Sequence, residues 1–71
     1  MKDTKMRIVV NGTPRDVSDG ITLLSLLEQL HLNPNTTVVE LNRDVLEKNS
    51  FVEVILAPGD HLELVRIVGG G

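Results

Sequence analysis

The sequence predicts an α+β fold in which four or so strands form a sheet and one main helix lies across one face. Three observations indicate it: extended apolar stretches near both ends of the chain, an Asn-Gly pair after the first stretch, and a leucine-rich segment with helical spacing. In chain order the elements are a hairpin, a helix, a strand, an irregular segment and a last strand, which fits a sheet with a helix on one side.

The N-terminal elements have the pattern of a β-hairpin. Residues 6–10 are apolar and mostly β-branched, interrupted only by Arg7, as expected of a strand. The dipeptide 11–12, Asn-Gly, favours a tight turn because both residues tolerate positive φ. Residues 13–17 would return antiparallel. Pro14 has no N–H to donate, so it suits an edge strand or a first strand position better than a strand's middle.

The next segment predicts the main helix. Thr22 is a suitable N-cap, and Pro34 disfavours helical geometry at the residue before it, so we expect the helix to end near His31 or Leu32. Apolar residues at helical spacing give it one broad apolar face. That face is formed by Leu23, Leu24, Leu26, Leu27 and Leu30.

The second half of the chain predicts two further strands with an irregular segment between them. We expect a strand at 38–42, with Val39 and Leu41 on the face opposite Val38, followed by a turn at 43–44. A single helical turn is predicted within 46–51. A Pro-Gly-Asp turn then leads into the last strand, at 61–68.

Length and composition limit the function classes. We predict a single domain over residues 1–68 and a flexible glycine tail at 69–71. The chain has no cysteine, which excludes thiol nucleophiles, disulfides and thiolate metal sites and is compatible with a cytoplasmic protein. The two histidines, His31 and His61, lie far apart in the sequence, and we assign neither a metal nor a catalytic role.

The charge and hydropathy patterns argue against nucleic-acid and membrane partners. The net charge is −3 and the chain has one aromatic residue, whereas nucleic-acid binders usually show a basic excess and stacking aromatics. No apolar run approaches the roughly 18 residues of a membrane span, and the N-terminus lacks the apolar centre of a signal peptide. We therefore expect a cytoplasmic location.

The usual catalytic patterns are also missing. No serine has the flanking glycines of a nucleophile elbow, no phosphate-binding loop occurs, and the carboxylates are too scattered to propose an acid–base pair. We predict no catalytic residue, no bound cofactor and no metal site.

The three glycines at 69–71 are open to two interpretations. They can be an ordinary frayed end. They can also be a bare backbone segment that enters a narrow slot in another protein, because glycine has no Cβ and lets the backbone approach closely. On spacing alone the two interpretations are equally supported.

Several short elements, taken in order, resemble the bacterial sulfur carriers of thiamine thiazole biosynthesis, the ThiS group. The similarity runs from residue 6 to residue 71, and a terminal Gly-Gly also occurs in ubiquitin-like modifiers. The shared elements are Val10-Asn11-Gly12, Thr22-Leu23, Leu26-Leu27, Leu30, Val39-Glu40-Leu41-Asn42, Gly59-Asp60, Leu62-Glu63-Leu64-Val65 and Val68-Gly69-Gly70-Gly71.

The resemblance implies a ubiquitin-like β-grasp fold, with a mixed sheet of four to five strands, and a carrier role without enzymatic activity. It implies that an adenylyltransferase of the ubiquitin-activating type uses ATP to adenylate the carboxylate of Gly71. A sulfur donor system, such as a cysteine desulfurase, would convert it to a thiocarboxylate that a thiazole synthase consumes. Gly69 and Gly70 would be the flexible lead.

The sequence departs from the family pattern after the third strand, where members often carry Arg and Trp and this chain has Lys48 and Phe51 nearby. Two alternatives stay open. One is a related carrier, either the small subunit of molybdopterin synthase or a ubiquitin-like modifier. The other is a non-covalent β-grasp binding module whose glycine tail is inert.

The last strand predicts a docking surface for the partner enzymes. If Leu62 and Leu64 point inward, Val65 and Ile67 point outward and, with Val68, form an apolar strip beside the tail. The alternative is that these residues cover a second small cluster or are isolated surface apolars, which are common. The predicted partner-binding residues are Val65, Arg66, Ile67, Val68, Gly69 and Gly70.

Overall fold

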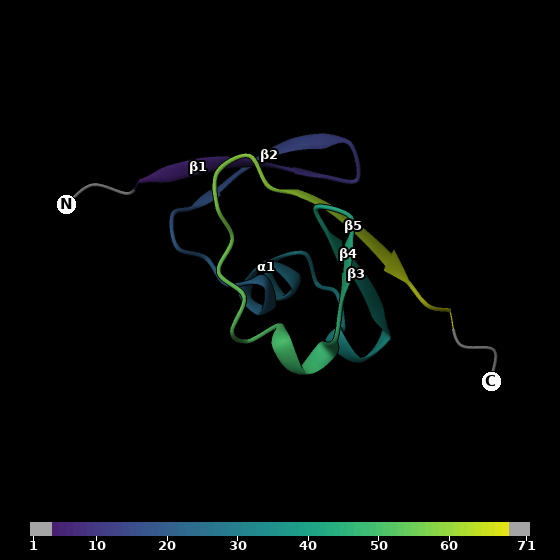
Figure 1. Cartoon of the computed structure of the whole chain (residues 1–71). Helices are drawn as coiled ribbons and strands as arrows, with labels where there is room; N and C mark the ends of the chain where they lie inside the picture. Colours follow the sequence, from purple (N-terminus) through teal and green to yellow (C-terminus); the bar gives the residue numbers. More distant parts are fainter. Residues whose placement is uncertain (1–3, 69–71) are drawn as a thin grey trace.

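The computed structural model describes residues 4–68, and within them five strands form one mixed sheet with a helix against its inner side (Figure 1). The strand order is β2-β1-β5-β3-β4; β1 and β5 are parallel and the other neighbours are antiparallel. The predicted α+β architecture is confirmed. The elements are β1 (Lys5–Val10), β2 (Thr13–Ser18), α1 (Leu23–Gln29), the 3-10 turn η1 (Pro34–Thr36), β3 (Thr37–Leu41), β4 (Asp44–Leu46), the 3-10 turn η2 (Lys48–Ser50) and β5 (His61–Arg66).

The N-terminal hairpin forms as predicted. Asn11 and Gly12 take φ of 51° and 81°, the positive values of a two-residue hairpin turn, and Val10 lies opposite Thr13. Pro14 lies in β2, an edge strand of the sheet, so its missing N–H removes no hydrogen bond from a central strand.

Helix α1 begins as predicted and ends slightly earlier. The Thr22 Oγ1 accepts a hydrogen bond from the Ser25 N–H at 3.1 Å, which satisfies a free donor of the first turn. At the other end His31 has a φ of 59° and donates to the Glu28 carbonyl, while Leu32 N–H donates to the Leu27 carbonyl. This pair of bonds is a Schellman C-cap, so the left-handed conformation of His31, and not Pro34, ends the helix.

The chain after β3 differs from the prediction. The turn lies at Asn42 and Arg43, with φ of 51° and 77°, and not at Arg43-Asp44. Asp44 instead begins β4, a three-residue strand that pairs with β3 and was not predicted. Such a short strand has no periodicity of its own, and its turn contains no glycine. The helical turn predicted within 46–51 is confirmed as η2.

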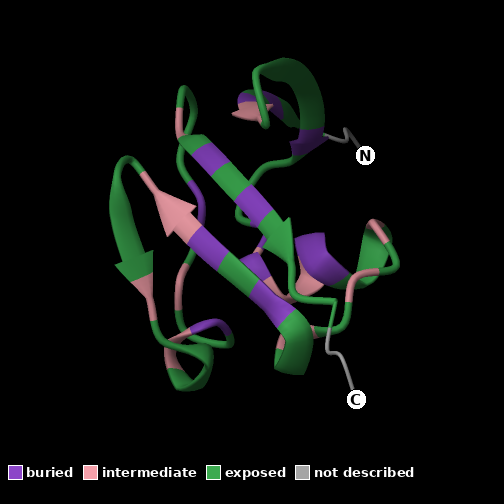
Figure 2. Cartoon of the chain, turned by 90° about the vertical axis from the view of Figure 1, so that its right-hand side faces the viewer, coloured by how far each residue is buried: buried purple, intermediate pink, exposed green. Residues whose placement is uncertain are grey.

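The core lies between the sheet and α1, and residues alternate between buried and exposed along the central strands (Figure 2). Val39 is buried and Val38 is exposed, so the two lie on opposite faces as predicted. The single aromatic residue, Phe51, is 2% exposed and fills the end of the core beside η2. The buried apolar residues are Met6, Ile8, Val17, Ile21, Leu23, Leu26, Leu27, Val39, Phe51, Leu56, Leu62 and Leu64.

β5 is the central strand of the sheet and leads toward the glycines. It ends at Arg66, two residues earlier than predicted, because its register with β3 stops at the pair Thr37–Arg66. One further hydrogen bond, from Ile67 N–H to the Thr36 carbonyl at 2.7 Å, holds the backbone just past the strand. In the described part of the chain, no helix is long and apolar enough to cross a membrane.

Candidate functional site

The candidate site is the face of the sheet that α1 leaves open, together with the segment that follows β5. Strand alternation places the odd-numbered residues of β5 on this face, and the antiparallel register sets the even-numbered residues of β3 beside them. Val38 lies opposite Val65, and Glu40 lies opposite Glu63. The face therefore has an apolar end near the tail and a polar end near the start of β5.

The apolar end is as exposed as the alternation predicts. The exposed fractions of Val65, Ile67 and Val68 are 57%, 54% and 85%, and Val38 adds a side chain that is 37% exposed. We call these four residues the apolar strip. Val38 and Val65 are cross-strand neighbours on the open face, and Ile67 follows on that face by alternation, so these three side chains share one exposed side of the sheet.

Arg66 lies apart from the apolar strip. By alternation it belongs to the same face as Leu62 and Leu64, which are buried against α1. Its own side chain is exposed because the strand has by then passed the edge of the core. Arg66 and the strip residues Val38, Val65 and Ile67 therefore present their side chains to opposite faces of the sheet.

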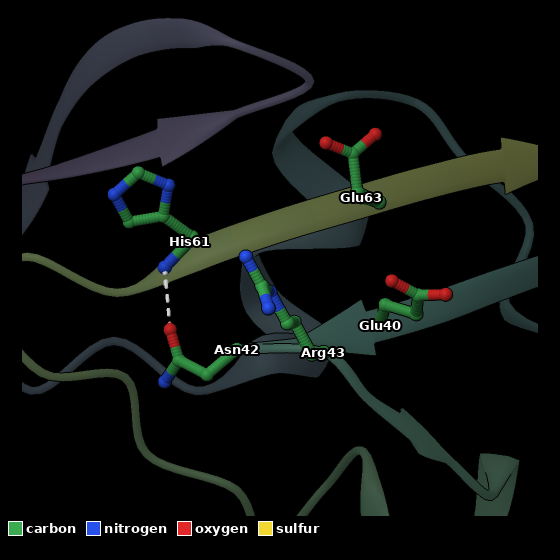
Figure 3. A pocket seen from close by; sticks show the side chains of 5 residues that line it. All are labelled: Glu40, Asn42, Arg43, His61 and Glu63. Carbon is green, nitrogen blue, oxygen red and sulfur yellow. Dashed lines mark hydrogen bonds between the residues drawn. The ribbon is translucent and has the colours of Figure 1, made fainter.

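The polar end is a shallow hollow that the sequence did not predict (Figure 3). The Asn42 side chain forms one wall: its Oδ1 accepts from the His61 N–H at 3.0 Å, and its Nδ2 donates to Asp60 Oδ1 at 3.1 Å. Glu40 and Glu63 face each other across two neighbouring strands, and like charges in that position repel. The hollow is lined by Glu40, Asn42, Arg43, His61 and Glu63.

A paired charge lies elsewhere on the same face. The Arg7 guanidinium donates to both carboxylate oxygens of Asp16, at 3.0 and 3.4 Å, across β1 and β2. This hydrogen bond, and secondly the Arg7 charge, hold the pKa of Asp16 below its usual value. The stabilisation is present above the ordinary carboxyl pKa and is lost as the pH falls through the lowered one. Both side chains are well exposed, so the pair is a surface feature.

The described residues offer binding surfaces and no recognisable catalytic set. Among residues 4–68, no group of three His, Asp or Glu side chains is placed to hold a metal ion. The hollow contains an imidazole, two carboxylates and a guanidinium but is open to solvent, so it suits contact with a polar surface. The predicted residues Gly69, Gly70 and Gly71 lie outside the described part of the chain.

Comparison with known proteins identifies the family. The ThiS family matches residues 8–71, which is most of the chain and includes the three glycines. The chain belongs to the ThiS family. The resemblance stated from the sequence is therefore confirmed, including its extent to the last residue.

Individual relatives agree with this assignment. Residues of this chain are 36% identical over 66 positions to a thiazole synthase of Paramagnetospirillum magneticum; the match covers 93% of the chain but only 20% of that protein. The sulfur carrier protein ThiS of Bacillus subtilis is 36% identical over 53 positions, covering 75% of this chain and 80% of that protein. The chain thus spans about a fifth of the thiazole synthase and most of the carrier.

Solved structures show the same fold. The crystal structure of the thiamine biosynthesis protein ThiS of Geobacter metallireducens matches with a TM-score of 0.80 at 33% identity, covering 93% of this chain and 100% of that one. A ubiquitin of Caldiarchaeum subterraneum matches at 22% identity with a TM-score of 0.54 and shows the fold alone. The predicted ubiquitin-like β-grasp is confirmed.

Sequence reasoning assigned no role to the residues of the hollow. A signal for them was nevertheless present, because Glu40, Asn42 and Glu63 all stand in the elements that carry the family resemblance. Their proximity depends on the positive φ of Asn42 and on hydrogen bonds that reach to Asp60 and His61. These long-range contacts cannot be read from the spacing.

Proposed function

We propose that this chain is a sulfur carrier of thiamine biosynthesis and that the carboxylate of Gly71 carries the sulfur. The observation that carries the proposal is the family match through residue 71, which makes the glycines part of the shared pattern. The course of β5 supports it, because the central strand leads from the most buried part of the sheet toward these glycines.

The chemistry we propose needs no catalytic group on the carrier. A carboxylate oxygen of Gly71 attacks the α-phosphorus of ATP in a partner adenylyltransferase, and pyrophosphate leaves. A persulfide on a donor protein, such as a cysteine desulfurase, then attacks the carbonyl carbon, and AMP leaves to give an acyl disulfide. A second thiol cleaves the S–S bond, forms a disulfide with the donor cysteine and leaves the outer sulfur on the carrier as a thiocarboxylate. Glycine at the reacting position leaves the carbonyl carbon free of side-chain hindrance.

We propose a thiazole synthase as the protein that consumes the thiocarboxylate. The support is the 66-residue match within a longer protein of that name, in which a carrier-like segment and a synthase share one chain. We also propose that the adenylyltransferase is of the ubiquitin-activating type, in keeping with the ubiquitin-like fold. We also propose a cytoplasmic location, since the chain has no cysteine and so no disulfide that would require an oxidising compartment.

Growth complementation tests the pathway. We expect this chain to restore thiazole-independent growth to a bacterium that lacks its own thiamine-type carrier. It should not restore molybdenum-cofactor synthesis to one that lacks the small subunit of molybdopterin synthase. Rescue of the second strain and not of the first would contradict the proposal and favour the molybdopterin pathway.

The apolar strip gives a prediction about docking. Replacing Val65 and Ile67 with Asp should leave the fold intact, because both side chains are more than half exposed. The two charges would meet an apolar partner surface and cost about 1–3 kcal/mol in binding, so the kcat/KM of adenylation should fall by about tenfold to a hundredfold.

Val52 and Ile55 provide a matched control. They are 60% and 64% exposed but lie on the segment between η2 and β5, away from the apolar strip. Replacing both with Asp makes the same change of charge and should leave adenylation within about twofold of the native chain, a change of at most 0.5 kcal/mol. Equal losses in the two double variants would show that net charge matters and the strip does not.

A further inference from the structure

One edge of β5 is covered by a neighbouring strand over only part of its length. β1 runs parallel to β5 and pairs with it at Val9–His61 and Val10–Leu62. There β1 ends, because the Asn11-Gly12 turn directs the chain away into β2. β5 continues to Arg66, so its second half extends past the end of β1 (Figure 1).

The Asn11 side chain takes the place of the missing strand as far as Leu64. Its Oδ1 accepts from the Leu64 N–H at 2.8 Å, and its Nδ2 donates to the Leu64 carbonyl at 3.2 Å. Together with the bond from Asn11 N–H to the Leu62 carbonyl, the side chain extends the pairing of β5 by two residues. Within residues 4–68, no hydrogen bond from β1 or its turn reaches β5 beyond Leu64.

The direction of each peptide group of β5 follows from its hydrogen bonds. The Ile67 N–H donates to the Thr36 carbonyl, and the His61 carbonyl accepts from the Asn42 N–H. The N–H and carbonyl groups of the odd-numbered residues therefore point toward the β3 side. The backbone groups of Leu62 and Leu64 bond to Asn11, so the N–H and carbonyl groups of the even-numbered residues point toward the β1 side. Arg66 is the next even-numbered residue, and its N–H and carbonyl face the side that β1 no longer covers.

The other exposed edges of the sheet lack this opening. β2 carries Pro14 and β4 is only three residues long, which are two of the ways in which proteins blunt an edge strand. The edge at Arg66 has no proline, and its neighbour Ile67 is held by a hydrogen bond to the carbonyl of Thr36, the residue just before β3. The Arg66 N–H and carbonyl are therefore directed to the side on which an added strand would pair.

We propose that the β5 edge at Arg66, continued at Val68, receives an extended strand from the adenylyltransferase that acts on Gly71. This inference rests on the proposed function and specifies how the partner holds the tail. Backbone hydrogen bonds to a strand edge are a recurrent mode of peptide recognition. From Arg66 to Gly71 an extended chain spans roughly 17 Å, so added pairing would fix the direction in which the tail leaves the sheet.

Strand addition and docking of the apolar strip use different sides of β5. The strip presents Val65 and Ile67 from the open face, whereas the Arg66 peptide groups lie in the plane of the sheet. A partner that contacts both the apolar strip and the Arg66 edge would hold β5 from the open face and also from within the plane of the sheet. The short opening, with an exposed charged side chain at Arg66, is too small to pair two copies of the chain stably without further contacts.

Amide hydrogen exchange tests the proposal on the native chain. In the free protein the Arg66 amide should exchange faster than the Ile67 amide, which is bonded to Thr36. In the complex with a thiamine-type adenylyltransferase and ATP, exchange at Arg66 should slow by about tenfold or more, while Ile67 changes little. Unchanged exchange at Arg66 in a complex whose formation is verified by its mass would overturn the proposal.

A matched pair of variants gives a second readout. Arg66→Pro removes the N–H and places the ring on the open edge, whereas Arg66→Ala removes the same side chain and keeps the N–H. We expect the kcat/KM of adenylation to be about tenfold lower for Arg66→Pro than for Arg66→Ala, with equal melting temperatures. If Arg66→Pro does not fold, the exchange experiment decides.

The outcomes separate this inference from the proposed function. If the native chain is adenylated and the two Arg66 variants behave alike, strand addition is wrong and the carrier function stands. If the native chain is not adenylated at all by an enzyme that is active on its own carrier, the carrier function fails and this inference fails with it.

Discussion

Deletion of Gly70 and Gly71 is expected to abolish adenylation and the rescue of thiazole-independent growth. The shortened chain still ends in a glycine carboxylate, that of Gly69, but this group lies roughly 7 Å short of the position that Gly71 would reach. A displacement of even 1 Å at a reacting centre can cost a hundredfold in rate, so no product should be detectable. The loss is expected without any loss of folding, because the deletion leaves β5 and the apolar strip unchanged.

The controls for this deletion are a truncation and a binding measurement. Removal of residues 1–3, which precede β1, should leave adenylation unchanged. The chain lacking Gly70 and Gly71 should still compete with the native chain for the adenylyltransferase, because the docking residues are present. A deletion variant with full biological activity would instead identify a binding module whose glycine tail is inert.

Replacing Phe51 with Ala is expected to be the most destabilising single change in the core. Phe51 is 2% exposed, and its backbone links two elements: its carbonyl accepts from Leu24 N–H at 3.1 Å, and its own N–H donates to Lys48. Truncation of a buried Phe costs about 3–5 kcal/mol, a large share of the roughly 5–15 kcal/mol by which whole domains are stable. A domain as small as this one has little stability to lose.

Urea unfolding monitored by circular dichroism measures this effect. The adjacent Val52 is 60% exposed, so Val52→Ala serves as the matched control and should change the free energy of unfolding by less than about 0.5 kcal/mol. Similar midpoints for the two variants would show that Phe51 does not fill the core.

Elements set by neighbouring residues could be predicted from the sequence, and elements set by distant contacts could not. The hairpin turn at Asn11-Gly12 and the Thr22 cap were both predicted because each depends on residues within a few positions. The helix end was misplaced because the left-handed His31 gives no sequence signal comparable to a glycine. β4 was missed because its three residues form a strand only by pairing with β3.

The candidate site likewise has parts that local sequence patterns predict and parts that depend on distant contacts. The outward direction of Val65 and Ile67 followed from alternation along the last strand, which is a local pattern. The hollow did not follow, because Asn42 reaches Asp60 and His61 across the sheet. The open edge at Arg66 depends on where β1 ends beside β5, a strand far away in the sequence. The Asn11–Leu64 hydrogen bonds that mark this end join residues 53 positions apart. Such registers require the folded structure.

The most direct test of the carrier function is the intact mass of the chain after incubation with a thiamine-type adenylyltransferase, ATP and a cysteine desulfurase with cysteine. We predict that one oxygen is replaced by sulfur and that fragmentation places the change at Gly71. An unchanged mass, obtained with an enzyme that does modify its own carrier in the same mixture, would contradict the proposal that Gly71 carries sulfur.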